Sequence, residues 1–446
     1  MTQEVRAVGA LAMLYVIRML GLFMILPVLF VYGEHYQSAT PALLGFALGV
    51  YGLSQALLQI PLGLLSDLIG RKPVLIIGLA LFALGSLIAA YSDSIWGLVL
   101  GRALQGSGAI ASTVMALVAD VTSDENRSKA MAAIGASIGM SFLLAMVLGP
   151  VVAGVGGLYA IFLLSAVLSG LGVLLVLFVI PNVRATSSRD SKAIPSLLKK
   201  SLFRVDLLRL NFGIFTLHAV MTAMFVAVPV MIINVLDLQV EQHWKLYLPL
   251  MLGSFIVAVY IMMRAERAGY AKPALLAAVL LMSFSLLGLG FGASLALIFI
   301  LALFVFFVAF NLLEAMLPSL ASKLSPAGGR GTAMGLYSSS QFLGAFCGGS
   351  LGGVVMAAAG SEYVFTLCAL MCLLWLLVAW AMPIPKSSQN MTYSVNAQVL
   401  DLDLQAFVGV EDTVYISEES KLYLKVDMTI LDSAALESEL APYAVE

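Results

Sequence analysis

Charged residues, cysteines and histidines are scarce in this sequence. Asp, Glu, Lys and Arg make up 11% of the 446 residues, whereas a soluble globular domain carries about 25%. Hydrophobic residues make up 61%, so the chain has too little polar surface to cover itself in water. We therefore expect a helical membrane protein that has the lipid bilayer as its solvent. The net charge of −2 and the lack of a basic patch argue against nucleic acid as a partner.

The reactive residue types are too few for most catalytic chemistry. The three cysteines, Cys347, Cys368 and Cys372, fall in apolar runs and form no CxxC pair, so we expect neither a disulfide framework nor a metal site. The three histidines are spread over the chain. The sequence contains no nucleophile–base pair, metal-ligand cluster or phosphate-binding loop. It therefore predicts that the protein is not an enzyme and binds no cofactor.

Apolar runs long enough to cross a bilayer, which takes about 20 residues, occur twelve times. A polar interval at 181–206 separates the first six from the last six. We predict an all-α membrane protein with two six-helix bundles, 1–182 and 207–383. The linker 183–206 could be an amphipathic helix on the inner leaflet or a flexible tether. The runs lie at 6–32, 42–66, 73–92, 94–120, 127–156, 158–180, 207–235, 243–265, 272–291, 293–322, 330–359 and 361–382.

Basic residues are sorted between the two sets of loops that join these runs. Loops rich in Lys and Arg remain in the cytoplasm. One set of loops contains Lys245 alone. Both termini are therefore predicted to be cytoplasmic, which requires an even number of spans. The basic set, which includes the N-terminus, contains Arg6, Arg71, Lys72, Arg127, Lys129, Arg184, Arg189, Lys192, Lys199, Lys200, Arg204, Arg209, Arg264, Arg267, Lys272, Lys323, Arg330 and Lys386.

The two halves are weakly similar to each other, and a different kind of segment follows them. The string that begins at Arg127 returns at Arg330 as Arg-x-x-Ala-Met, and such parallel halves are a repeat design of transporters. Residues 393–446 are acidic. Alternation over Thr413–Ser417 and Lys421–Asp427 predicts a β-hairpin, and Asp432 is a helix N-cap signal. A small cytosolic α+β domain is expected there.

The most specific motif lies between the second and third runs. In Gly63-Leu-Leu-Ser-Asp67-Leu-Ile-Gly70-Arg71-Lys72-Pro73, Gly63 permits close helix contact and Gly70 permits a tight turn. Asp67 can pair with a cation. Any short inside loop should carry Arg and Lys, but that explanation does not account for an acid four residues before a Gly-Arg-Lys-Pro turn. We call residues 63–73 the latch loop.

A second motif, Arg102-Ala-Leu-Gln105-Gly106-Ser-Gly108, lies inside the fourth run. An arginine in a bilayer costs several kcal/mol unless it is paired or hydrated, so it marks a functional site by default. The alternative is a structural arginine that donates hydrogen bonds to carbonyl groups of neighbouring helices.

Other polar residues inside the runs are candidates for the transport path. Glu314 in the tenth run could carry a proton, or it could pair permanently with Arg18 of the first run as a structural strut. His218 could titrate, although a lone histidine is more often a packing residue. Asn311 and Gln341 could line the path or simply link helices. In the fifth run, Gly139, Gly149, Pro150 and Gly154 are expected to permit close packing and a kink.

Together these motifs resemble those of the major facilitator superfamily. The resemblance implies that the latch loop holds the two halves together through a charge network of Asp67, Arg71 and Asp120. Arg127, in the segment that is repeated at Arg330, is assigned to the same network. It implies that Arg102 and Gln105 belong to a proton-coupling motif. The glycines of the fifth run resemble the antiporter motif of exporter branches. The acidic tail resembles the ferredoxin-like cytosolic domain of a drug/proton antiporter branch found in the bacterial inner membrane.

The expected function is proton-coupled efflux of small amphiphilic or drug-like molecules by alternating access. The expected partners are this substrate, protons and the lipid bilayer, and the chain is expected to be a monomer. An unknown ligand or protein could bind the C-terminal domain. Two alternatives remain: proton-coupled uptake with the same machinery, and a membrane sensor that has lost transport and acts through its C-terminal domain.

Overall fold

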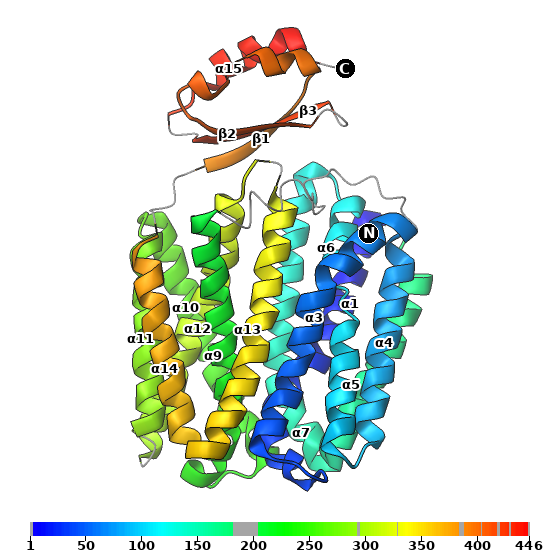
Figure 1. Ribbon diagram of the computed structural model, residues 1–446, viewed down its shortest axis with the longest axis vertical. Coiled ribbons are helices and arrows are strands. Elements are labelled where there is room, and N and C mark those ends of the chain that lie inside the picture. Colours follow the sequence, from blue (N-terminus) through cyan, green and yellow to red (C-terminus); the bar gives the residue numbers. More distant parts are fainter. Residues whose placement is uncertain are drawn as a thin grey trace.

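The computed structural model describes residues 3–181, 204–291, 295–327, 329–382, 388–402, 404–416, 420–427 and 430–444. Long helices stand side by side, and a small β-sheet domain lies beyond one end of them (Figure 1). Eleven described helices are long and apolar enough to cross a membrane. The helices of this part are α1 (Gln3–Phe23), α2 (Leu29–Tyr32), α3 (Pro41–Ile69), α4 (Arg71–Tyr91), α5 (Ile95–Ser107), α6 (Ala111–Val121), α7 (Asp124–Phe178), α9 (Val205–Leu236), α10 (Trp244–Arg267), α11 (Ala271–Phe291), α12 (Ala296–Leu324), α13 (Arg330–Ala359) and α14 (Ser361–Trp380).

Two predicted spans, 127–156 and 158–180, fall in the single element α7. As a straight rod its 55 residues would extend about 80 Å, more than twice the ~30 Å of the hydrocarbon layer. The backbone leaves the helical region at Gly156 and at Gly157, which has a φ of 61°. Ala130 of the first arm and Val176 of the second lie in one apolar cluster. The chain therefore reverses at the glycine pair, on the predicted boundary.

Two other predicted spans are interrupted. α1 ends at Phe23, and the short α2 begins after Pro27, whose ring nitrogen carries no hydrogen to donate. The fourth run is divided into α5 and α6 at Gly108, which has a φ of −75° and a ψ of 43°. A helix end leaves backbone carbonyl groups without helical partners, so side chains can bond to them.

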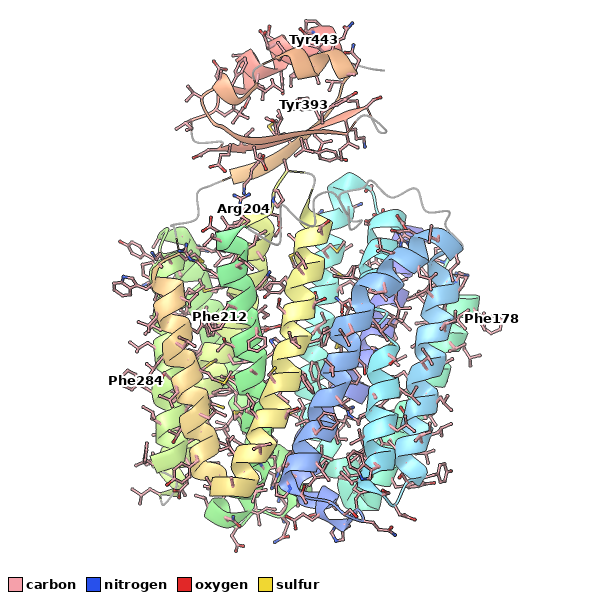
Figure 2. All side chains as sticks on the ribbon, in the orientation of Figure 1. Phe178, Arg204, Phe212, Phe284, Tyr393 and Tyr443 are labelled. Carbon is pink, nitrogen blue, oxygen red and sulfur yellow. The ribbon has the colours of Figure 1, made fainter. Side chains whose placement is uncertain are left out.

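The helices form two groups of packed neighbours. The first bundle comprises α1 to α7, and the second comprises α9 to α14. Large apolar side chains cover the outside of both, and Phe178 and Phe284 point away from the two flanks (Figure 2), with 77% and 64% of their surfaces exposed. Apolar surface of this extent is stable in lipid rather than in water. The prediction of a helical membrane protein is confirmed. Residues 183–203 of the predicted linker lie outside the described residues.

The bundles meet along α3 and α13, more closely at one end than at the other. We call the end that carries the β-sheet domain the domain end, and the opposite end the far end. Toward the far end, a Cβ added to Gly49 would lie 2.6 Å from the carbonyl oxygen of Phe346. Toward the domain end, a Cβ added to Gly335 would lie 3.8 Å from Ile60. The two helices diverge toward the domain end (Figure 1).

A hydrogen bond joins the bundles at the far end. The Tyr32 hydroxyl group of the first bundle donates to Glu241 Oε1 at 2.9 Å. Glu241 lies in the short helix η3 (Val240–Gln242), and its side chain also packs against Gly154 of α7. The bundles are therefore packed together at the far end and spread at the domain end.

The C-terminal domain is a three-stranded antiparallel sheet with the strand order β1-β3-β2. Its strands are β1 (Ser388–Ser394), β2 (Val410–Ile416) and β3 (Lys421–Asp427). The prediction of β3 is confirmed, and the predicted hairpin corresponds to β2 and β3. The predicted start of the domain, residue 393, is wrong because β1 begins at Ser388.

The helices of this domain differ from a complete ferredoxin-like fold. Among the described residues between β1 and β2 lie the 3₁₀ turns η4 (Ala397–Asp401) and η5 (Leu404–Ala406) and no α-helix. α15 (Ser433–Leu440) follows β3, and the Asp432 carboxylate caps it by accepting from the Ala435 N–H at 3.1 Å. The domain is a small sheet with one described α-helix.

The sheet rests on the domain end of the second bundle. Leu424 of β3 packs in the apolar core under α15, so its neighbour Lys425 faces the other way. Lys425 Nζ donates to the Ser325 carbonyl oxygen at 3.3 Å, and Asp412 Oδ2 accepts from the Ala327 N–H at 3.3 Å. Ser325 and Ala327 lie between α12 and α13. The domain is therefore attached to the connection between these two helices.

Lys425 is buried by this contact at 2% exposure. Burial lowers its pKa to about 8, and the positive charge of Arg204 acts in the same direction. Figure 2 shows Arg204 between the helices and the sheet.

Candidate functional site

The first polar cluster lies inside the first bundle. Arg18 of α1 is 4% exposed, and its Nη1 and Nη2 both donate to the Gln105 carbonyl oxygen at 3.1 Å. Nη2 also lies 3.5 Å from Gln55 Oε1 of α3. The Gln105 carbonyl group is available because α5 ends two residues later, at Ser107. The break in the fourth span therefore creates an acceptor for Arg18.

Arg102 of α5, with 1% exposure, belongs to the same cluster. Its Nη1 donates to Gln105 Oε1 at 2.8 Å. Gln105 Nε2 donates to Ser86 Oγ at 2.7 Å, and the Ser86 hydroxyl group donates to the Phe82 carbonyl oxygen at 2.7 Å. The Ser86 hydroxyl hydrogen is used in the bond to Phe82, so the Ser86 oxygen can only accept from Gln105. The Gln105 side chain must therefore direct its NH₂ group to Ser86 and its amide oxygen to Arg102.

Glycines bring the helices together around the two arginines. A Cβ added to Gly106 would collide with the Tyr51 carbonyl oxygen. The close approach of α3 and α5 places the Tyr51 ring centroid 4.8 Å from Arg102 Cζ and 5.5 Å from Arg18 Cζ. At these distances the ring face attracts a cation. Gly108 lies against the Gly78 carbonyl group in the same manner and marks the helix break.

The second polar cluster joins three helices of the second bundle. His218 of α9 lies with its Nε2 2.7 Å from Gln341 Nε2 of α13 and 3.8 Å from Glu314 Oε2 of α12. When the imidazole is neutral, its Nε2 can accept from the Gln341 amide. The Glu314 side chain is 36% exposed, whereas that of His218 is 9% exposed. The Glu314 side chain is therefore partly accessible, while its Oε2 is buried beside the imidazole.

The structure separates two residues that the sequence analysis considered as a pair. Arg18 bonds to neutral groups, and the ion-pair partner that the described residues give Glu314 is His218. A permanent Arg18–Glu314 strut is therefore wrong in this conformation. Asn311, one turn before Glu314, donates from Nδ2 to Ser254 Oγ at 3.1 Å and links α12 to α10.

The latch loop connects α3 to α4. Gly70 has a φ of 97°, which favours glycine, and α4 begins at Arg71. Arg71 is 3% exposed, with Nη1 2.5 Å from Asp67 Oδ1 and Nε 3.1 Å from Asp120 Oδ2 of α6. Nη1 also donates to Ser66 Oγ at 2.6 Å. The structure thus brings together the three charged residues that the resemblance implied, all of them in the first bundle.

The other residues predicted for the latch have less specific surroundings. A Cβ added to Gly63 would lie 3.0 Å from Ser112 Oγ, so α3 and α6 approach closely there. Lys72 is half-buried in the first turn of α4. Arg127 lies near the start of α7, and its side chain is outside the described part of the chain.

The small residues predicted to pack the fifth span have different surroundings. A Cβ added to Gly149 would lie 2.5 Å from the Met24 carbonyl oxygen, and Gly154 packs against Glu241. Pro150 lies inside the helix. Nothing described lies within 4 Å of a Cβ added to Gly139. The prediction of close packing holds toward the far end and is wrong for Gly139 in this conformation.

Sequence reasoning did not identify Tyr51 or Ser86. Tyr51 covers two guanidinium groups, and Ser86 orients the Gln105 amide. Both stand in apolar runs, where such residues are ordinarily part of the core. The spacing of glycines opposite Tyr51 was the one local signal that α3 and α5 approach each other.

Comparison with known proteins identifies the class. The family model of the Major Facilitator Superfamily matches residues 11–265 and 250–394. The chain therefore belongs to the Major Facilitator Superfamily, and it is a secondary transporter rather than an enzyme. In fold it is similar to the human organic anion transporter MFSD10 (TETRAN), with a TM-score of 0.63 and 20% identity over 84% of this chain and 99% of that one. At this identity the likeness concerns the fold alone.

Three relatives indicate which members of the superfamily this chain is similar to. The chain is 43% identical over 443 residues to the inner membrane transport protein YajR of Escherichia coli (strain K12), covering 98% of this chain and 97% of that protein. It is 36% identical to an uncharacterized transporter of Buchnera aphidicola, over 77% of this chain and 89% of that protein. A shorter match, 36% identity over 30% of this chain and 33% of the relative, is to the class B tetracycline resistance protein of Escherichia coli.

Proposed function

We propose that the protein exports small amphiphilic or drug-like molecules in exchange for protons. Two bundles of six crossings, with α7 counted as two, rock about the contact between α3 and α13. The conformation described above, packed at the far end and spread at the domain end, is one of the two that alternate. Two six-helix halves that move around a path between them are a common transporter design.

The domain end is assigned to the cytoplasm of a bacterial cell. The loops rich in Lys and Arg favour cytoplasmic termini, and the N-terminus lies at the same end as the C-terminal domain (Figure 1). The name of the relative YajR places that protein in an inner membrane. The proposed location is therefore the inner membrane, with both termini in the cytoplasm and the substrate path open to it.

The observation that carries this proposal is the position of Glu314. Its side chain is 36% exposed inside a membrane helix, and its buried Oε2 lies 3.8 Å from His218 Nε2. An ionisable group within a membrane segment marks a proton or substrate path by default. When protonated, Glu314 is neutral and suits an apolar site. When it releases its proton, the carboxylate can be stabilised by the imidazole side chain if His218 Nε2 carries a hydrogen.

Export is favoured over uptake by two observations. Gly149 in the fifth span packs closely against Met24 and Pro27, in the segment between α1 and α2, and the next residue, Pro150, belongs to the same motif that resembles the antiporter motif. Tetracycline resistance proteins of classes B, E and C match 30% of this chain at 34–38% identity. Those proteins are named for resistance to a drug, and we propose by analogy that this chain also transports a drug-like substrate.

The experiment uses purified protein in liposomes with an imposed pH gradient. A compound panel that includes tetracycline is added, and a pH-sensitive dye inside the liposomes reports proton movement. Wild-type protein is expected to couple movement of at least one compound to counter-movement of protons. Glu314→Gln should lose the coupled proton signal because an amide does not titrate, and the matched control Glu362→Gln, an exposed carboxylate at the start of α14, should keep it.

Three outcomes would contradict the proposal. Substrate accumulation in the same direction as the protons would identify an uptake symporter. A proton signal that survives in Glu314→Gln would show that another group carries the proton. An intact resistance phenotype in cells with the same variant would favour a protein that does not depend on this carboxyl group at all.

A further inference from the structure

The charge of the first polar cluster is not balanced by the protein. Arg18 and Arg102 are 4% and 1% exposed, and their acceptors are the neutral groups of Gln105 and Gln55. Within the described ranges, no carboxylate oxygen lies at ion-pair distance from either guanidinium group. Buried charges in proteins are ordinarily paired, and a charge inside a membrane is costlier still. Two neighbouring positive charges here require an anion or water.

The guanidinium groups also keep unused hydrogen-bond donors. Each offers five N–H groups, and the buried Arg102 Nε has no acceptor among the described residues. Aromatic rings occupy the faces of both, with the Phe82 ring centroid 4.3 Å from Arg18 Cζ and the Tyr51 ring over both groups. A further ligand must therefore approach along the N–H edges. A carboxylate fits those edges with two parallel hydrogen bonds.

There is a small space where such a group can enter. A cavity of about 10 Å³ lies beside Arg18, lined also by Tyr15, Gln55 and apolar side chains of α1 and α6. This is close to the volume that admits one water molecule. In this conformation it suits one compact ion or a single oxygen atom, and a whole carboxylate group requires the cluster to open.

The cluster lies at the contact between the bundles. Tyr51 packs with Phe82 and with Phe342 of α13, which is 9% exposed. Tyr51 therefore touches both guanidinium groups on one side and the second bundle on the other. Separation of α3 from α13 removes Phe342 from Tyr51 and opens the cluster to the path between the bundles. This position connects the charge of a ligand to the movement of the helices.

We propose that Arg18 and Arg102 form a binding site for one compact negative charge, which is the carboxylate of a transported organic anion or a halide ion. The proposal rests on the proposed function in one respect, since it names the charge of the substrate. Binding itself requires no proton gradient. The site and the proton coupling can therefore fail separately.

The test measures equilibrium binding of radiolabelled benzoate to the purified full-length protein, at low chloride, with chloride as competitor. Wild-type protein is expected to bind benzoate saturably, and Arg102→Gln and Arg18→Gln should each weaken binding at least tenfold. The matched control Arg209→Gln, a half-buried arginine paired with Asp206 at the start of α9, should bind as wild type does. Glu314→Gln should also bind benzoate, which separates this site from the proton carrier.

Competition distinguishes the two sources of negative charge. Benzoate binding that chloride does not displace assigns the site to the substrate carboxylate, and displacement at millimolar chloride assigns it to a halide. Either result supports the proposal. Wild-type protein that binds neither ion saturably overturns it, and this outcome does not depend on the folding of any variant. Binding that is unchanged in both arginine variants overturns it as well, because the ion must then bind elsewhere.

Discussion

Replacement of Arg71 by alanine tests the charged network of the latch loop. Arg71 donates to Asp67 and Asp120 through different nitrogen atoms, and the side chains of Arg71 and Asp120 are 2% and 0% exposed. Removal of one partner of a buried ion pair costs about 3–5 kcal/mol because the other charge stays in the interior. The Asp67 side chain is 19% exposed, so its contact adds at most about 1 kcal/mol. We expect Arg71→Ala to lower the free energy of unfolding by at most about 3–5 kcal/mol, because Asp120 has a further interaction within the protein.

The measurement is reversible unfolding in mixed micelles, compared with Lys72→Ala as the matched control. Lys72 is the next residue in the same helical turn and carries the same charge, but it is half-buried. The double variant Arg71→Ala/Asp120→Ala should recover part of the loss because the buried carboxylate is removed with its partner. Arg71→Lys should be intermediate, since one ammonium group cannot reproduce both contacts.

One result would refute this reasoning. If Arg71→Ala costs no more than Lys72→Ala, the buried network does not stabilise this conformation. The latch loop would then contribute no measurable stability to this conformation through Asp67, Arg71 and Asp120.

Two further predictions concern the packing of α5 and the attachment of the C-terminal domain. Gly106→Val should destabilise the protein by about 1–3 kcal/mol in the same assay, because its side chain would collide with the Tyr51 carbonyl group, whereas Gly135→Val, with nothing within 4 Å, should not. Burial lowers the pKa of Lys425 to about 8 from its usual 10.5, so the attached domain binds fewer protons between these values than the detached one. Attachment should therefore strengthen as the pH rises from about 8, by at most about 1.4 kcal/mol per pH unit. Energy transfer between dyes on the sheet and on α12 measures it, and Lys425→Met should abolish the pH dependence. A wild-type signal that weakens or stays constant over this range would contradict the prediction.

The proposed anion site and the proposed proton carrier lie in different bundles, which has a consequence for transport. Arg102 and Arg18 belong to the first bundle, and Glu314 belongs to the second. A ligand at the arginines and a proton at the carboxyl group therefore act on opposite sides of the contact between α3 and α13. Coupling between them would pass through the movement of the bundles rather than through direct contact. Measurement of benzoate affinity in Glu314→Gln examines this independence directly.

Local features of the sequence were sufficient to predict most of the helices. Hydropathy placed the start of α3 within one residue of Pro41 and that of α13 at Arg330, because a crossing helix must keep its whole surface apolar over about 20 residues. The strand at Lys421–Asp427 and the cap at Asp432 followed from spacing alone. The Asp67–Arg71 contact joins residues four positions apart across the Gly70 turn, so it lies within the motif itself.

The tertiary structure decided the partners of the buried polar residues. Arg18 pairs with the Gln105 carbonyl group, 87 residues away, and Glu314 lies beside His218. The C-terminal sheet attaches through Lys425 to Ser325. Hydropathy and periodicity indicate which residues of a segment face lipid and which face the core. The acceptor of a buried hydrogen-bond donor, however, depends on which other helices pack next to it. The sequence by itself thus determined a membrane transporter with two halves and a charged latch. Only the packing of those halves showed two buried arginines without a carboxylate partner among the described residues.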